Sequence, residues 1–215
     1  MAEQRVLRGW SDGELACRLA KLEELSISFD EDERAQMRAG DERWHPVRSG
    51  AVIAREPPGP PVPDGPFERA RELVAEYRFS DPSIVSATFD RARPLLGRRM
   101  LLEIRVLGLR YLCGTVVGAV RDERKEGETV FGFRYDTLEG HIERGEEWFL
   151  LRKDHASGAI HFTIASRWQR GELASGWTRA GFTVLAGRYR AIWLRRAHAR
   201  MRAMLGEAPS TPGRA

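Results

Sequence analysis

The segment FTVLAGRYRAIWLRRAHARMRAML, residues 182–205, predicts one long amphipathic helix near the C-terminus. Its apolar residues recur at helical spacing, and they are Leu185, Tyr189, Ile192, Trp193, Ala197, Met201 and Met204. Arginines occupy much of the remaining surface, at positions 188, 190, 195, 196, 200 and 202. A helix of this kind needs a large apolar surface to cover its tryptophan-bearing side.

Segments with strand-like alternation precede this helix. In residues 160–168, Ile160, Phe162, Ile164 and Trp168 point one way, and polar side chains point the other way. Similar segments lie at 83–89, 99–106, 111–120, 129–135 and 146–153, and a helix is expected at 67–79, after Pro66. The predicted class is α+β, with an antiparallel sheet of five to seven strands.

A sheet that curls around the final helix would bury the apolar faces of both. This is the helix-grip arrangement of START-type lipid-transfer domains and Bet v 1-type pollen allergens. A curved sheet around a helix often leaves a ligand cavity between them. The side chains expected to line such a cavity are Phe131, Phe133, Phe162, Trp168 and Trp193, although they could equally fill the space.

The rest of the chain divides by composition. Residues 1–43 predict an acidic helical extension, with helices at 11–25 and 30–39. Residues 44–66 predict a strand at 47–55 and then a stiff proline-rich strap, REPPGPPVPDGP. Residues 67–205 form the expected helix-grip domain, and residues 206–215 a disordered tail.

Composition excludes several classes of protein. The two cysteines have no paired spacing, which argues against a disulfide framework or a zinc finger. Neither a signal peptide nor an apolar run of membrane-spanning length is found, so the cytoplasm is the expected location. Charge is uneven along the chain. Residues 1–45 hold seven basic and eleven acidic side chains, whereas residues 170–205 hold eight arginines and one glutamate.

The arginine-rich C-terminal segment could meet phosphates or acidic lipids, or it could be a solvated helix face. Nucleic-acid binding is not expected, because helical spacing turns Tyr189 and Trp193 inward while the arginines face outward.

The densest polar run is YDTLEGHIERGEE, residues 135–147. In an extended segment His141 and Glu143 share a side, and Glu147 joins them unless Gly145 forms a bulge. These three residues are the candidate catalytic group, with the histidine as an acid–base residue oriented by a carboxylate. Alternatively, the residues bind a ligand or cap the backbone of a glycine turn. The three could also hold a divalent metal, but no established metal-ligand spacing is present, so no metal or cofactor is predicted.

The same run resembles the hallmark of an uncharacterised bacterial and plant family known as domain of unknown function nineteen-ninety. The family pattern, aromatic-x-T-L-x-G-H-x-x-x-G-E-E, is matched by Tyr135, Thr137, Leu138, Gly140, His141, Gly145, Glu146 and Glu147. The resemblance extends from about Trp44 to Leu205, and Trp168 stands where members often have proline. It implies that the run matters, but it assigns no reaction.

Three functions follow as hypotheses. The first is a module that binds a small apolar or amphipathic molecule, with Tyr135, Thr137, His141 and Glu146 closing one end of the cavity. The second is an enzyme on the same scaffold, of the hydrolase, cyclase or dehydratase kind. The third is binding of phosphate-rich polymers or membrane surfaces through the arginines of the last helix. The sequence leans toward the first, without enzymatic activity.

Overall fold

The computed structural model describes residues 3–6, 8–171 and 176–206, with side chains in the last range described from residue 187 onward. The side chain of Leu185 and the expected tail beyond Gly206 therefore lie outside what the structure describes. The strands are β1 (Glu3–Val6), β2 (His45–Arg55), β3 (Val85–Thr88), β4 (Arg99–Val106), β5 (Leu109–Lys125), β6 (Glu128–Thr137), β7 (Glu143–Asp154) and β8 (Ala159–Arg170). The helices are α1 (Asp12–Lys21), a 3₁₀ turn η1 (Leu22–Glu24), α2 (Glu31–Ala39), α3 (Pro66–Ala75) and α4 (Gly176–Gly206).

The strands form one curved antiparallel sheet in the order β2-β8-β7-β6-β5-β4-β3. The eighth strand, β1, pairs with the beginning of β5, next to Leu109–Leu112. That stretch of β5 has a free edge because β6 pairs with β5 only from Thr115 onward. The predicted antiparallel sheet is confirmed, and β1 is the strand that the sequence patterns did not reveal.

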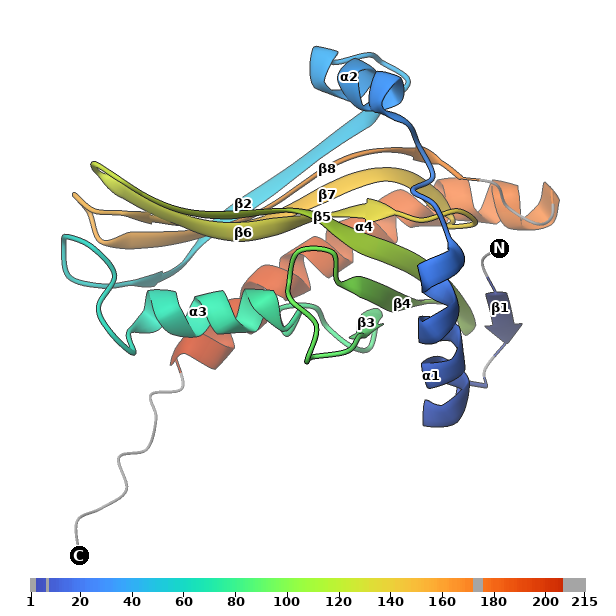
Figure 1. The fold of residues 1–215 in the computed structure, drawn as a ribbon, viewed down its shortest axis with the longest axis horizontal. Coiled ribbons are helices and arrows are strands. Elements are labelled where there is room, and N and C mark those ends of the chain that lie inside the picture. The colour runs from blue at the N-terminus through green and yellow to red at the C-terminus, as the bar shows by residue number, and fades with distance from the viewer. Residues whose placement is uncertain (1–2, 7, 172–175, 207–215) are drawn as a thin grey trace, which may run out of the picture.

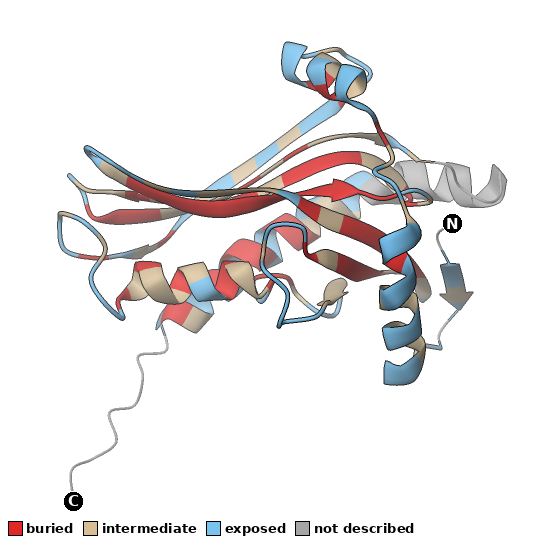
Figure 2. Ribbon diagram, viewed as in Figure 1, coloured by how far each residue is buried: buried red, intermediate tan, exposed pale blue. Residues whose placement is uncertain are grey.

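The sheet curls around α4, and α3 lies beside that helix on the same face, as Figure 1 shows. Trp193 on α4 is buried, and its Nε1 donates a hydrogen bond to Ser80 Oγ at 3.0 Å. Figure 2 shows buried residues running along the strands and the sides of both helices. The α+β helix-grip architecture is therefore confirmed, with α4 enclosed by the sheet.

Aromatic rings fill most of the space between sheet and helices. Phe149 of β7 lies 5.2 Å from Phe133 and 4.8 Å from Phe79, measured between ring centroids. Phe79 also lies 5.1 Å from Phe162 of β8. These side chains are fully buried. Close packing at this density leaves little room for a ligand in the middle of the sheet.

The proline-rich strap is tied to the core by a buried ion pair. Lys153 Nζ lies 2.6 Å from Glu56 Oε2 and donates to Pro60 O at 2.9 Å. Glu56 also accepts hydrogen bonds from the backbone N–H groups of Val62 and Phe67, so it caps the first turn of α3. The carboxylate thus satisfies one donor in the strap and one at the N-terminus of α3, a position where negative charge is stabilising.

The N-terminal extension covers the other face of the sheet. Helix α1 begins at a capping box formed by Ser11 and Glu14, and α2 ends at Gly40 in the left-handed conformation, as the sequence predicts. Leu22 of η1 is buried against Leu101 and Leu112 of the sheet, and Trp10 packs beside them. The segment that contains Trp10 and Leu22 therefore packs against the chain's own sheet.

Two local predictions are wrong. The helix expected at 67–79 ends at Ala75, because Tyr77 adopts a φ of +55°, which a helix cannot continue through. The strand expected at 111–120 runs from Leu109 to Lys125, and the chain reverses at Gly127. No bulge occurs at Gly145, and the register shifts lie at Val52/Ala54 and Val117/Ala119 instead.

Candidate functional site

A small cavity of about 90 Å³ lies between α4 and the β4–β7 side of the sheet. Its apolar wall comes from Ile84, Val85, Leu102, Ile104, Val106, Ile142 and Trp193. Its polar wall comes from Tyr77, Tyr135, His141, Glu143, Glu147, Tyr189 and Arg190. The cavity therefore combines an apolar body with one polar end, the combination that is typical of small-molecule sites.

His141 lies just before β7 and is buried. Its Nδ1 accepts a hydrogen bond of 3.0 Å from the backbone N–H of Glu143. Burial lowers the pKa of His141 to about 4, against an opposing effect of the Glu143 carboxylate. The ring is therefore neutral at pH 7, with its proton on Nε2. Within the described part of the chain, that Nε2 has no hydrogen-bond partner.

Tyr135 and Glu147 face each other on paired positions of β6 and β7. The Tyr135 hydroxyl donates to Glu147 Oε2 at 2.6 Å. Burial raises the pKa of Glu147, although the nearby Arg190 charge opposes that rise. Burial also raises the pKa of Tyr135 and Tyr77 well above the usual value, and the charge of Glu147 adds to both shifts. Both phenols are therefore protonated donors at neutral pH.

Arg190 closes the polar end from helix α4. Its guanidinium pairs with the Glu143 carboxylate, donates to Ser166 Oγ at 3.1 Å and lies 4.6 Å above the Trp168 ring. The expectation that the arginines of this helix face outward is wrong for Arg190, because its ion pair and the indole ring hold it inside. Arg190 is the residue of this site that helical spacing missed.

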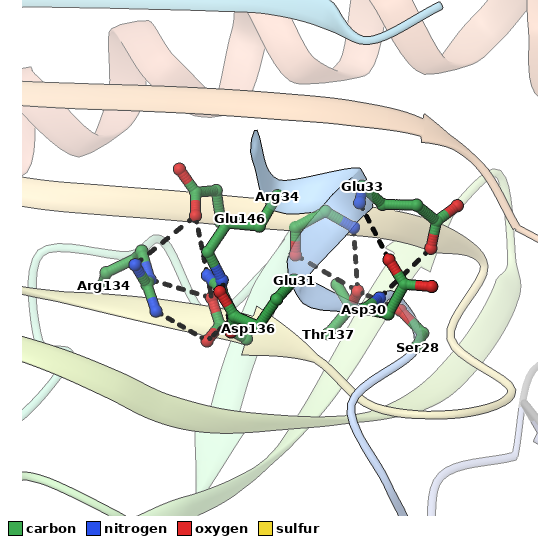
Figure 3. A network of polar contacts seen from close by, with 10 residues as sticks. Ser28, Asp30, Glu31, Glu33, Arg34, Arg134, Asp136, Thr137 and Glu146 are labelled. Atoms are coloured by element: carbon green, nitrogen blue, oxygen red, sulfur yellow. Dashed lines mark hydrogen bonds and ion pairs between the residues drawn. The ribbon is translucent and has the colours of Figure 1, made fainter. Parts of the chain in front are cut away.

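The motif of residues 135–147 has two faces, since side chains alternate along a strand. Tyr135 and Glu147 face the cavity, whereas Asp136 and Glu146 face the N-terminal extension. Arg34 of α2 donates to both oxygens of Asp136 at 3.1 and 3.3 Å and to Glu146 at 3.0 Å. Figure 3 shows Arg34 between these carboxylates, with Arg134 on the other side of Asp136.

Thr137 also contacts the N-terminal extension, although strand alternation places it on the same face as Tyr135. Its hydroxyl lies 2.7 Å from Ser28 Oγ, and it also accepts from the backbone N–H of Gly145 at 2.9 Å. Arg144 adds to these contacts by bonding Ser28 O and the Glu33 carboxylate. Thr137 and Glu146, which were expected at the ligand, thus bond the N-terminal extension, and both also line a smaller pocket of about 20 Å³ beside His141 and Arg190.

The other predicted ligand-binding residues fall into two groups, those at the cavity and those in the packed core. Tyr135, His141 and Trp193 line the cavity, and Trp168 supports Arg190 from below. Phe131, Phe133 and Phe162 belong to the packed core and do not line it. The three candidate catalytic residues, His141, Glu143 and Glu147, do come together at the cavity.

Their contacts differ from the expected acid–base arrangement. The hydrogen bond to His141 comes from the backbone of Glu143, while the Glu143 carboxylate pairs with Arg190. A metal site at these three residues is not supported, because among the described residues no group of three His, Cys, Asp or Glu side chains is placed to hold an ion. The helices within the described ranges include none that is long and apolar enough to cross a bilayer.

The fold and the cavity together define a helix-grip protein with a small, one-ended polar site. The model of the family "Domain of unknown function (DUF1990)" matches residues 31–200, and the chain belongs to this family. The match begins in α2, so the helix that contributes Arg34 is part of the family's common region. No curated protein matches the sequence.

Several solved structures are similar in fold. Ginseng major latex-like protein 151 from Panax ginseng has 10% identity and a TM-score of 0.45, covering 75% of this chain and 97% of its own. Ara h 8.0201 has 10% identity and a TM-score of 0.40, covering 74% and 99%. A protein from Thermus thermophilus has 13% identity and a TM-score of 0.42, also covering 74% and 99%. These similarities concern the fold alone.

Proposed function

We propose that this protein binds a small apolar or amphipathic molecule in the cavity between α4 and the sheet. The observation that carries the proposal is the buried His141 Nε2–H, which lacks a partner among the described residues and belongs to the polar end of the cavity. A buried donor left without a partner is costly, and a ligand acceptor would remove that cost.

The size of the cavity limits the occupant. A volume of about 90 Å³ accommodates roughly six to nine water-sized groups, at ~10–15 Å³ for each. The buried part of the ligand is therefore the size of a single ring. Larger molecules would need Tyr189 and Arg190 on α4 to move.

Native mass spectrometry of the purified full-length protein tests this function. We expect a dissociable small-molecule adduct on the wild type, or binding of added cyclohexylmethanol when the cavity is empty. Ile104→Trp should abolish both, because the indole would occupy the cavity. Leu96→Trp is the matched control, since Leu96 is exposed and does not line the cavity. A wild-type protein with neither adduct nor added ligand would refute the proposal.

Acid–base catalysis in the same cavity is the second candidate, and the buried Glu147 carboxyl favours it. Its raised pKa and its bond to Tyr135 are features of a proton-transfer group. If a substrate is found, Glu147→Gln should abolish turnover while retaining binding. Unchanged turnover in His141→Ala would show that the histidine only binds.

Binding of phosphates through the arginines of α4 has less support. Arg196 pairs with Asp81, and the side chains of Arg200 and Arg202 donate to backbone carbonyls of Arg78 and Val52. These contacts clamp the helix to the domain. Salt-sensitive binding to a phosphate-rich polymer would still support this function, because phosphate contacts release counterions.

A further inference from the structure

The polar end of the cavity offers one donor that no described residue uses. His141 Nδ1 is occupied by the backbone N–H of Glu143, so the ring proton resides on Nε2. That N–H is buried and has no described partner. His141 lines the cavity, so a ligand acceptor that reaches this N–H would complete its hydrogen bonding.

The same end offers an acceptor. Glu147 Oε2 accepts the Tyr135 hydroxyl, but no described residue donates to Glu147 Oε1. A buried carboxyl group with one unused oxygen is an incomplete hydrogen-bond arrangement. A ligand group that donates a proton would complete it.

The charge of the wall decides between ligand classes. Glu143 and Arg190 form an ion pair, and the guanidinium is further committed to Ser166 and the Trp168 ring. His141 is neutral. The cation among the described lining residues, Arg190, is already paired with Glu143, and an ionised Glu147 would repel an anionic ligand.

We propose that the cavity selects a neutral apolar molecule with one hydroxyl group, which accepts from His141 Nε2–H and donates to Glu147 Oε1. This inference deepens the proposed binding function and rests on it. A carboxylate would lack the proton that Glu147 needs. An ammonium group would satisfy Glu147 but would leave the His141 donor unpaired.

Three probes with one skeleton separate these cases, namely cyclohexylmethanol, cyclohexanecarboxylate and cyclohexylmethylamine. The ring fits the volume of about 90 Å³, and only the polar group changes. Titration calorimetry on the wild-type protein at pH 7.5 should give at least tenfold tighter binding of the alcohol than of either charged probe.

Two variants locate the selectivity. Glu147→Gln retains the shape of the side chain and removes its charge, so affinity for the carboxylate should rise at least threefold. His141→Phe removes the donor, so affinity for the alcohol should fall about fivefold or more, while Leu96→Trp should leave all three affinities unchanged. The wild-type ranking stands as a test even if a variant does not fold.

The outcomes separate the two proposals. Equal or tighter binding of the carboxylate or the amine would overturn the hydroxyl selectivity and leave the binding function standing. Binding of none of the probes, together with an unliganded protein in native mass spectrometry, would overturn both.

Discussion

Replacing Lys153 by methionine should lower the free energy of unfolding by about 3–5 kcal/mol, the range for breaking a buried ion pair. The side chains of Lys153 and Glu56 are 0% and 1% exposed, so water cannot replace the lost ammonium. The variant loses hydrogen bonds to Glu56 Oε2 and Pro60 O, each ~1.5–3 kcal/mol for a charged group. Two backbone N–H groups still bond Glu56 in the variant, so the loss in the free energy of unfolding should stay within about 3–5 kcal/mol.

Urea denaturation followed by tryptophan fluorescence measures this loss, which corresponds to a fall in Tm of roughly 10 °C for a chain of this size. The double variant Glu56→Gln/Lys153→Met should recover part of the stability, because no buried charge is left. Lys125→Met is the matched control, since Lys125 forms an exposed pair with Glu123, and it should change stability by less than ~0.5 kcal/mol. A loss below ~1 kcal/mol for Lys153→Met would refute the reasoning.

The ion pair also predicts a dependence on pH. Burial acts to raise the pKa of Glu56, but the Lys153 ammonium and the backbone N–H groups outweigh it, and the folded-state pKa is lowered. The contribution is therefore fully present above the unfolded value of 4.5 and is lost as the pH falls through the folded-state pKa. In Lys153→Met, the free energy of unfolding should therefore fall less between neutral and acidic pH than it does in the wild-type protein.

Three further predictions concern the motif and its surroundings. Arg34→Met should cost ~3 kcal/mol in urea denaturation, because Asp136 stays buried with one arginine fewer, whereas Arg43→Met, at an exposed local pair, should have no measurable effect. Gly118→Ala should lower stability by ~1–3 kcal/mol, because its Cβ would lie 2.1 Å from Asp136 Oδ2; an unchanged denaturation midpoint would contradict this steric reasoning. The lowered pKa of His141 means that only the unfolded chain takes up this proton between pH 6.5 and about 4, so stability should fall by ~3 kcal/mol as the pH drops through that window. His141→Gln should flatten that part of a Tm–pH profile, and an unaltered slope would show that another group titrates there.

Periodic patterns allowed most of the fold to be predicted. The strands of β4 and β8 and the caps of α1 and α2 follow from local alternation and from residues such as Ser11 and Gly40, whose effects extend over a few positions. Strand β1 could not be predicted, because its pairing depends on a free edge of β5 that exists only in the assembled sheet. The end of α3 depends on the conformation of Tyr77, which packs against Phe79 and Phe149.

The candidate site shows the same contrast between what local sequence patterns predict and what long-range contacts decide. The sequence by itself indicated that a polar run at residues 135–147 joins two strand-like segments and that His141, Glu143 and Glu147 can share a side. Tertiary structure alone decided which groups each face of that run meets. Asp136 and Glu146 bond Arg34, which lies more than a hundred residues away in the sequence, and Glu143 pairs with Arg190 of α4. Pairing between distant segments is set by how the sheet curves around its helices, and strand alternation carries no information about that curvature.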